Sequence, residues 1–397
     1  MSQPQCVRSL DGFVFAWPDL PFRIELSRIK ESSRATSGEL QVKYIPLSGT
    51  PTTITHQTFN LLTSKTKLAK ELQSRHEAPW PSMLEQVCVL TLRQLRQGEP
   101  IESLQPTQED SPAWFVVNPL LYEKNCTILY GPGDSMKSYF CLYVGLLLAS
   151  GKSGPLLSVA PDPWKVLFLD WEMSVQDVRG RVKMLQAGDD RLTGMPDYRR
   201  CYQPLADDVS ELKKVVSEGG YDVLIIDSLA MAAGGTELEK ADSAIRFNAA
   251  LRSLNCTSLV IGHTPKPNEE QKERSLYGSV FFHNLCRNSW ECWREGQTLA
   301  LHHRKHNLGP EHDPLGFTLE IDGTTCRITE ANISDEATSL GLYLQDQIAN
   351  ELKARPMQTP REIADMIGST QAVVRAKLNA LKSKRFISID GKWELIR

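Results

Sequence analysis

Two short segments near the start of the chain alternate between apolar and polar residues. They span residues 22–26 and 40–44, and each places an apolar side chain at every second position. A period of two is typical of half-buried β-strands. Between residues 83 and 95 the apolar positions recur at helical intervals, which predicts a helix packed on the sheet. We therefore expect a small α+β domain with an antiparallel sheet over residues 1–97.

The pattern changes after a polar, proline-containing segment at residues 98–114, which is typical of a linker. Short, largely apolar runs then alternate with helical segments, as in a mostly parallel sheet covered on both faces. These runs span residues 126–130, 166–169, 223–226 and 258–261. Later runs predict an antiparallel extension of the sheet, at residues 290–294, 298–303 and 317–321. Together they define an α/β core over residues 115–332.

The end of the chain, residues 341–397, predicts a helix, a turn, two further helices and a two-stranded wing. Thr359 is suited to cap the second helix, because Pro360 follows at its first position with Glu362 close behind. Gly368 then ends that helix, and Ser369 starts the third. We expect a winged-helix domain here.

The overall composition does not change this picture, but the charge of one predicted helix does. The chain of 397 residues is 41% hydrophobic and 23% charged, and its formal net charge of -3 gives no overall attraction to nucleic acid. The expected third helix of the last domain is different, because it carries basic residues and no acidic one. Its basic residues are Arg375, Lys377 and Lys382. This predicts a local DNA-binding surface.

Cysteine usage and hydropathy bear on location. The nine cysteines form no C-x-x-C pair, and the first residues lack the apolar segment of a signal peptide. The most apolar stretch, residues 139–149, is shorter than the roughly 20 residues that a membrane helix needs. We expect a cytoplasmic protein that makes no membrane contact.

A phosphate-binding loop is the main chemical motif. An apolar strand leads into a glycine-containing loop that ends in Lys-Ser and opens an apolar helix; the loop comprises Gly131, Pro132, Gly133, Asp134, Ser135, Met136, Lys137 and Ser138. Backbone N–H groups there would surround the phosphates of ATP, Lys137 would reach the β and γ oxygens, and Ser138 would ligate Mg²⁺. Met136 stands where the motif has its second glycine, so the loop needs a backbone geometry that a side chain tolerates. Without other signals, a Gly-Pro turn before a core helix explains the segment equally well.

Acidic residues at two later strand ends strengthen the ATP-site interpretation. Asp227 follows the run at residues 223–226, where an aspartate can hold Mg²⁺ through water. Asp170 and Glu172 follow the run at residues 166–169, at the sheet edge where ligands of open α/β sheets bind. The alternatives are a turn-capping role for Asp227 and a capping or ion-pairing role for Glu172, with Asp170 as its competitor.

Taken together, the P-loop, the acidic strand ends and the Val260-Ile261-Gly262-His263 segment resemble RecA-like AAA ATPases of plasmids and phages, typified by the hexameric replicative helicase RepA. The resemblance covers about residues 115–330. It implies that Glu172 orients or deprotonates the attacking water and that His263 senses the γ-phosphate. From the residues alone, a hydrogen-bonded strand-end role for His263 is the simpler interpretation.

In related ring helicases, basic residues of a later strand reach the nucleotide of the neighbouring subunit. By position these would be Arg304 and Lys305; the alternative is a solvated basic turn. The nearby histidines at 302, 303, 306 and 312 suggest a metal site, which we reject because no cysteine lies at zinc spacing and alternation sends His302 and His303 to opposite faces.

The sequence thus favours an ATP-driven DNA motor, a replicative or accessory helicase that assembles as a homo-oligomeric ring, expected to be a hexamer. The polar segment at residues 265–275 is long enough to form a mobile loop facing single-stranded DNA in a central channel. Its basic residues are Lys266, Lys272 and Arg274. The rival is a nucleotide-dependent DNA-binding switch, initiator or recombination ATPase that does not unwind DNA. A third interpretation makes the last domain a protein-interaction module.

Overall fold

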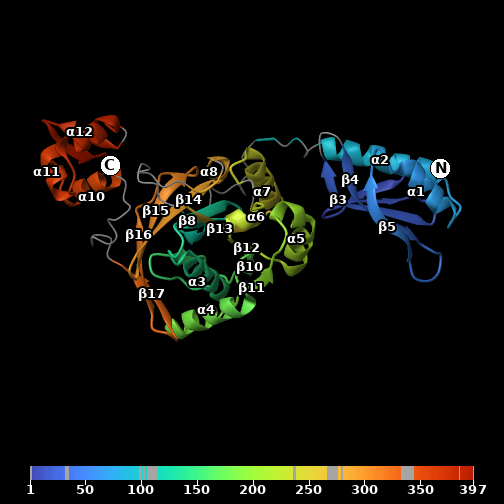
Figure 1. Cartoon of the computed structure of the whole chain (residues 1–397), viewed down its shortest axis with the longest axis horizontal. Coiled ribbons are helices and arrows are strands. Elements are labelled where there is room, and N and C mark those ends of the chain that lie inside the picture. Colours follow the sequence, from blue (N-terminus) through green and yellow to red (C-terminus); the bar gives the residue numbers. More distant parts are fainter. Residues whose placement is uncertain are drawn as a thin grey trace. The chain divides into compact units, whose positions relative to one another are not determined.

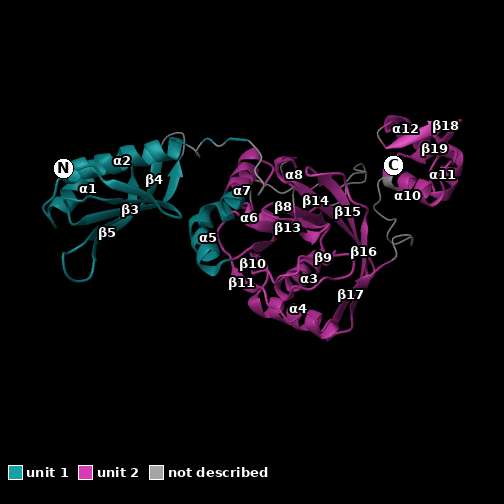
Figure 2. Cartoon of the chain, turned by 180° about the vertical axis from the view of Figure 1, so that it is seen from behind, with its two compact units in different colours: residues 1–112, 205–220, 250–254 teal, residues 113–204, 221–249, 255–397 magenta. Residues whose placement is uncertain are grey.

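The computed structural model describes most of the chain. The described residues are 2–31, 35–97, 101, 103–104, 114–235, 238–265, 276–278, 280–331, 344–383 and 385–396. They form two compact units, coloured separately in Figure 2. The first comprises residues 1–112, 205–220 and 250–254, and the second comprises residues 113–204, 221–249 and 255–397.

The first unit contains the small α+β fold that the alternating segments predict (Figure 1). Its five strands pair antiparallel in chain order: β1 (Gln5–Arg8), β2 (Gly12–Ala16), β3 (Phe22–Glu31), β4 (Thr36–Tyr44) and β5 (Thr52–Asn60). Helices α1 (Lys65–Gln73) and α2 (Trp80–Gln97) pack their apolar sides into the same hydrophobic core as the sheet. The centre of this core includes the fully buried Trp80, Ile24 and Leu40.

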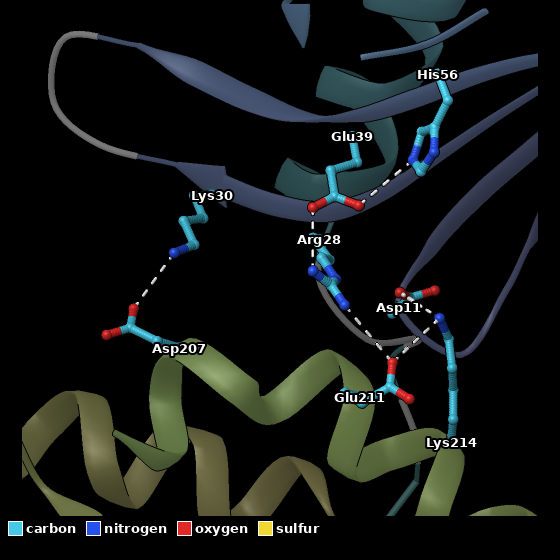
Figure 3. A network of polar contacts seen from close by, with 8 residues as sticks. All are labelled: Asp11, Arg28, Lys30, Glu39, His56, Asp207, Glu211 and Lys214. Carbon is cyan, nitrogen blue, oxygen red and sulfur yellow. Dashed lines mark hydrogen bonds and ion pairs between the residues drawn. The ribbon is translucent and has the colours of Figure 1, made fainter. Parts of the chain in front are cut away.

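Helix α5 (Leu205–Gly219) also belongs to this unit, and charged side chains join it to the strands (Figure 3). Lys30 pairs with Asp207 at 3.3 Å, and Arg28 Nη2 lies 3.7 Å from Glu211. These side chains are largely exposed, and exposed ion pairs contribute about 0–1 kcal/mol each. The network therefore adds little to stability.

The second unit is built on a nine-stranded sheet of order β11-β10-β12-β13-β8-β14-β15-β16-β17 (Figure 1). The first six strands are parallel: β11 (Asp197–Arg200), β10 (Val166–Asp170), β12 (Val223–Asp227), β13 (Thr257–His263), β8 (Cys126–Gly131) and β14 (Asn288–Glu295). The last three continue antiparallel: β15 (Thr298–His306), β16 (Leu315–Ile321) and β17 (Cys326–Glu330). The mostly parallel α/β core predicted from the apolar runs is confirmed.

One strand differs from the expectation. The pattern predicts the run at residues 290–294 in the antiparallel extension, but β14 pairs parallel with β8, and only its other edge is antiparallel, against β15. The reason is that an apolar run carries no information on direction; the chain returns through α8 (Val280–Leu285) before entering β14. This placement brings the end of β14 beside the P-loop.

Helices connect the parallel strands and complete the core. They are α3 (Lys137–Ser150), α4 (Val175–Gly188), α6 (Leu229–Ala232) and α7 (Ala241–Ser253). Helix α3 is buried almost all round, and its Phe140 and Leu146 share a hydrophobic cluster with Phe168 and Ile225 of the sheet. A small sheet of β7 (Leu121–Tyr122), β6 (Phe115–Asn118) and β9 (Ser158–Val159) packs into the same cluster.

The C-terminal elements follow the predicted order. They are α10 (Leu344–Ala354), α11 (Pro360–Met366), α12 (Gln371–Ala380) and the antiparallel pair β18 (Phe386–Ile389) and β19 (Lys392–Leu395). Thr359 caps α11 through a capping box with Glu362, as expected. The cap of α12 is Thr370, one residue later than the expected Ser369, because its hydroxyl accepts the N–H of Val373.

In the described part of the chain, every helix is too short or too polar to span a membrane.

Candidate nucleotide-binding site

The P-loop lies between β8 and α3, where the motif predicts it. Met136 is the residue before α3 and has φ 61° and ψ 15°, in the left-handed region. The loop has therefore kept the backbone conformation for which glycine is favoured, and the methionine side chain is accommodated at some conformational cost. The loop geometry thus tolerates a side chain at this position, although in a conformation that glycine adopts more easily.

Lys137 lies inside the loop and is only 4% exposed. Its ammonium donates hydrogen bonds to the carbonyl oxygens of Gly131, at 3.1 Å, and Pro132, and to Ser135 Oγ at 2.9 Å. Burial lowers the pKa of Lys137, and acidic groups nearby act in the opposite direction. A phosphate placed at the loop would supply the anion that this buried cation lacks.

Asp227 and Ser138 meet at the carboxyl edge of the sheet, as the motif requires. Asp227, at the end of β12, is 2% exposed and accepts a hydrogen bond from the Ser138 hydroxyl. Burial raises the pKa of Asp227 to about 7; the carboxylates of Glu172 and Asp170 act in the same direction, and the Ser138 bond opposes them. A hydroxyl and a carboxylate beside further acids are the oxygen donors that Mg²⁺ prefers, so these residues fit the ion. When bound, Mg²⁺ would neutralise charge on the phosphates.

The geometry distinguishes Glu172 from Asp170. Asp170 is fully buried, and its Oδ1 accepts the backbone N–H groups of Glu172 and Met173 at 2.7 and 3.0 Å. Its other oxygen accepts the Tyr198 hydroxyl at 3.3 Å. Asp170 therefore shapes the turn, whereas Glu172 is exposed and accepts a hydrogen bond from Ser228. This arrangement favours Glu172 as the group that faces substrate water.

His263 ends β13 directly beside the P-loop. In the register of the two strands it pairs with Gly131, and its backbone carbonyl accepts the N–H of Tyr277 at 2.7 Å. Burial lowers the pKa of His263, and the charge of Lys137 lowers it further, while Glu172 opposes. The imidazole therefore lies within electrostatic range of both groups, and its sensor role stays a prediction.

Arg304 and Lys305 are engaged within their own chain. Arg304 Nε lies 2.7 Å from Glu291, and the two side chains are 6% and 1% exposed. Lys305 donates to the carbonyl oxygens of His283 and Asn284, at 2.7 and 2.8 Å, near the end of α8. In this conformation neither cation reaches outward, so action on a neighbouring subunit requires these bonds to break.

The other predicted residues lie elsewhere. Of the basic residues on α12 and just after it, Arg375 and Lys382 are exposed and Lys377 is half-buried. The channel-loop residues Lys266, Lys272 and Arg274 lie outside the described residues. Sequence reasoning missed Ser228, which holds Glu172, although its position directly after Asp227 at a strand end was a usable signal.

The histidine cluster has the spacing of a metal site, but one of its members is already fully hydrogen-bonded. His303, His306 and His312 bring ring nitrogens within 4.8 Å of one another. His303 Nε2, however, is hydrogen-bonded to Asn288 Oδ1 at 2.6 Å, and its Nδ1 accepts the N–H of His312 at 2.8 Å. Both nitrogens of His303 are thus occupied, and its ring stacks on Trp290 with a centroid separation of 4.3 Å. The cluster is better explained as aromatic packing.

Comparison with known proteins bears on the core. Residues 94–269 match the model of a protein family described as an AAA domain. No curated protein sequence matches the chain. Among solved structures, one described as an ATPase domain aligns with a TM-score of 0.41 at 11% identity, over 53% of this chain and 86% of that one. The crystal structure of the RadB recombinase aligns with a TM-score of 0.38 at 16% identity, over 53% of this chain and 92% of that one. The family match and the converging side chains together support a nucleotide-binding P-loop core.

Proposed function

We propose that this protein is an ATP-hydrolysing DNA motor, a RepA-like hexameric helicase. The observation that carries the ATPase part is the convergence of Lys137, Ser138, Asp227, Glu172 and His263 at one edge of the sheet. Lys137 and the loop amides bind the phosphates, Ser138 and Asp227 hold Mg²⁺, and Glu172 takes a proton from the attacking water. His263 reports the state of the γ-phosphate.

The DNA part rests on the C-terminal elements. Three helices followed by a two-stranded hairpin have the element order of a winged helix, and α12 stands where such a domain has its recognition helix. Its described side chains include no acid, and Arg375 is exposed to reach a phosphate. These features support contact of the C-terminal elements with duplex or single-stranded DNA, although the overall charge of the chain does not favour DNA binding.

A second function is favoured by one observation. Arg304 and Lys305 are both bound inside their own chain, so in this conformation neither is placed to act on the nucleotide of a neighbour. In other phosphate-transferring systems such a cation accelerates turnover by about a thousandfold or more. A slow ATPase that switches DNA binding without translocation, such as an initiator or recombination ATPase, follows from the same site.

The test is the rate of ATP hydrolysis with and without single-stranded DNA, followed by strand displacement from a tailed duplex. A motor hydrolyses faster on DNA and releases the strand. A switch binds DNA under ATP control and releases none, which would refute the motor. Lys137→Ala should weaken ATP binding and abolish turnover, whereas Glu172→Gln should retain ATP and slow hydrolysis by roughly a hundredfold or more. Normal hydrolysis by Glu172→Gln would refute its role and make Asp170 the candidate base.

A further inference from the structure

A cavity of about 450 Å³ opens beside the P-loop. Loop residues 132–135 line one wall. Trp293 and Arg294 near the end of β14 and Gly296 in the turn that follows line the other. No role described so far uses these three residues. The cavity is therefore a part of the site whose ligand contact is still to be explained.

Strand order determines which end of a nucleotide would lie there. Glu172 and Asp227 follow β10 and β12, which lie on one side of β8 in the sheet, whereas β14 lies on the other side. A nucleoside triphosphate is a linear molecule with the γ-phosphate at one end and the base at the other. If the γ-phosphate lies between Lys137 and the carboxylates, the β14 side of the loop is the side left for the base end.

The end of β14 is held close to the loop. Glu291 pairs with Tyr130 in the parallel register, so the next residues of β14 run alongside the start of the P-loop. The carbonyl oxygen of Cys292 lies 2.4 Å from the place where a side chain on Gly131 would begin. Only glycine at position 131 permits this approach, and it brings Trp293 to the wall of the cavity.

Arg294 fixes the turn to the loop. Its Nη1 donates to the carbonyl oxygen of Asp134, and its Nε donates to that of Gly296, each at 2.8 Å. One guanidinium thus ties the two walls together before any ligand arrives. The Trp293 indole, half-buried near the end of β14, offers an aromatic ring at the cavity wall that this bond helps to hold in place.

We propose that Trp293 is the base platform of the nucleotide site: the purine ring of the nucleotide stacks on its indole, and Arg294 holds that indole in place by joining the turn to the P-loop. This rests on the proposed function, since it requires a nucleotide at the P-loop. Stacking uses the face of the base and not its edge, so the platform accepts adenine and guanine alike.

The test measures the contribution of the base to binding separately from that of the phosphates. Calorimetric titrations with Mg²⁺ would compare ADP, GDP and inorganic tripolyphosphate on the full chain, in the wild type, Trp293→Ala and Trp293→Phe. Stacking of a base on an aromatic side chain makes Trp293→Ala weaken ADP and GDP binding by about tenfold or more, with tripolyphosphate unchanged. Trp293→Phe should retain most of the affinity. Trp114→Ala, which removes a 55% exposed indole elsewhere, is the matched control and should change nothing.

Two results would overturn the platform. Unchanged ADP affinity in Trp293→Ala would place the base elsewhere. Equal weakening of ADP and tripolyphosphate would show that the indole supports the P-loop and not the base. A wild-type chain that binds neither ligand would instead refute the proposed ATPase site itself, so the two failures are distinguishable.

Discussion

His302 predicts a specific sensitivity of the fold to acid. The side chain is 1% exposed on β15, and neither ring nitrogen has a hydrogen-bond partner among the described residues. Burial, assisted by the nearby charge of Arg304, lowers the pKa of His302 from 6.5 to about 3. The folded state therefore keeps the ring neutral down to low pH.

The direction and magnitude of the pH effect on stability follow from the difference between the pKa of His302 in the folded chain, about 3, and its ordinary value of 6.5. As pH falls below 6.5 the unfolded chain takes up a proton at His302 and the folded chain does not, so stability is lost between pH 6.5 and about 3. Between pH 7.5 and pH 5.5 this one residue lowers the free energy of unfolding by about 1.4 kcal/mol. This loss of stability hardly depends on the pKa of His302 in the folded state, as long as that pKa lies well below 5.5.

Urea denaturation at these two pH values would measure the effect. His302→Leu should reduce the acid-induced loss by about 1.4 kcal/mol and should not lower stability at pH 7.5, because it removes a buried polar ring without partners. Leu301→Ala is the control, since it removes a buried apolar side chain from the same strand, and it should lower stability equally at the two pH values. If the wild type and His302→Leu lose equal stability, the ring is hydrated or paired and the reasoning is wrong.

Three further outcomes are expected. Arg304→Ala should lower the free energy of unfolding by about 3–5 kcal/mol in urea denaturation, because it leaves the buried Glu291 carboxylate without its cation; a double replacement by leucine should recover most of this. Met136→Gly should retain nucleotide affinity, whereas the β-branched Met136→Val, forced into a left-handed backbone, should weaken it by about tenfold in a binding titration. Three basic side chains lie on α12 or just after it, and replacing them by alanine should weaken DNA binding. The slope of log K for DNA against log salt should flatten by about one unit per lost phosphate contact. An unchanged slope would favour a protein-interaction role.

The sequence sufficed to predict those parts of the site that lie within one segment or directly after a strand. Lys137 and Ser138 lie in one continuous segment, and Asp227 and Glu172 directly follow apolar runs, so knowing that the strands are parallel suffices to bring them to one edge. The mostly parallel sheet itself follows from the length and spacing of those runs.

What could not be predicted depends on pairing between distant segments. The partner of Arg304 lies across a hairpin, and nothing in either segment identifies Glu291 as the carboxylate that buries it. Trp293 reaches the P-loop only because β14 runs parallel to β8, which an apolar run does not reveal. The left-handed backbone of Met136 was hidden for a different reason: a side chain usually excludes that conformation, and here the surrounding loop imposes it.

The charge pattern at the sheet edge indicates that nucleotide and Mg²⁺ bind as one unit. Lys137 is buried against loop carbonyls, so a phosphate is favoured beside it. The carboxylates of Glu172 and Asp227 lie close to the same place, and their repulsion would act on any unneutralised γ-phosphate. Burial raises the pKa of Asp227 to about 7, and the carboxylates of Glu172 and Asp170 act in the same direction. A divalent ion held by Ser138 and Asp227 would remove the repulsion, and it would do so only while a phosphate completes its coordination. The affinity for ATP should therefore depend steeply on Mg²⁺, because each ligand supplies the charge that the other needs.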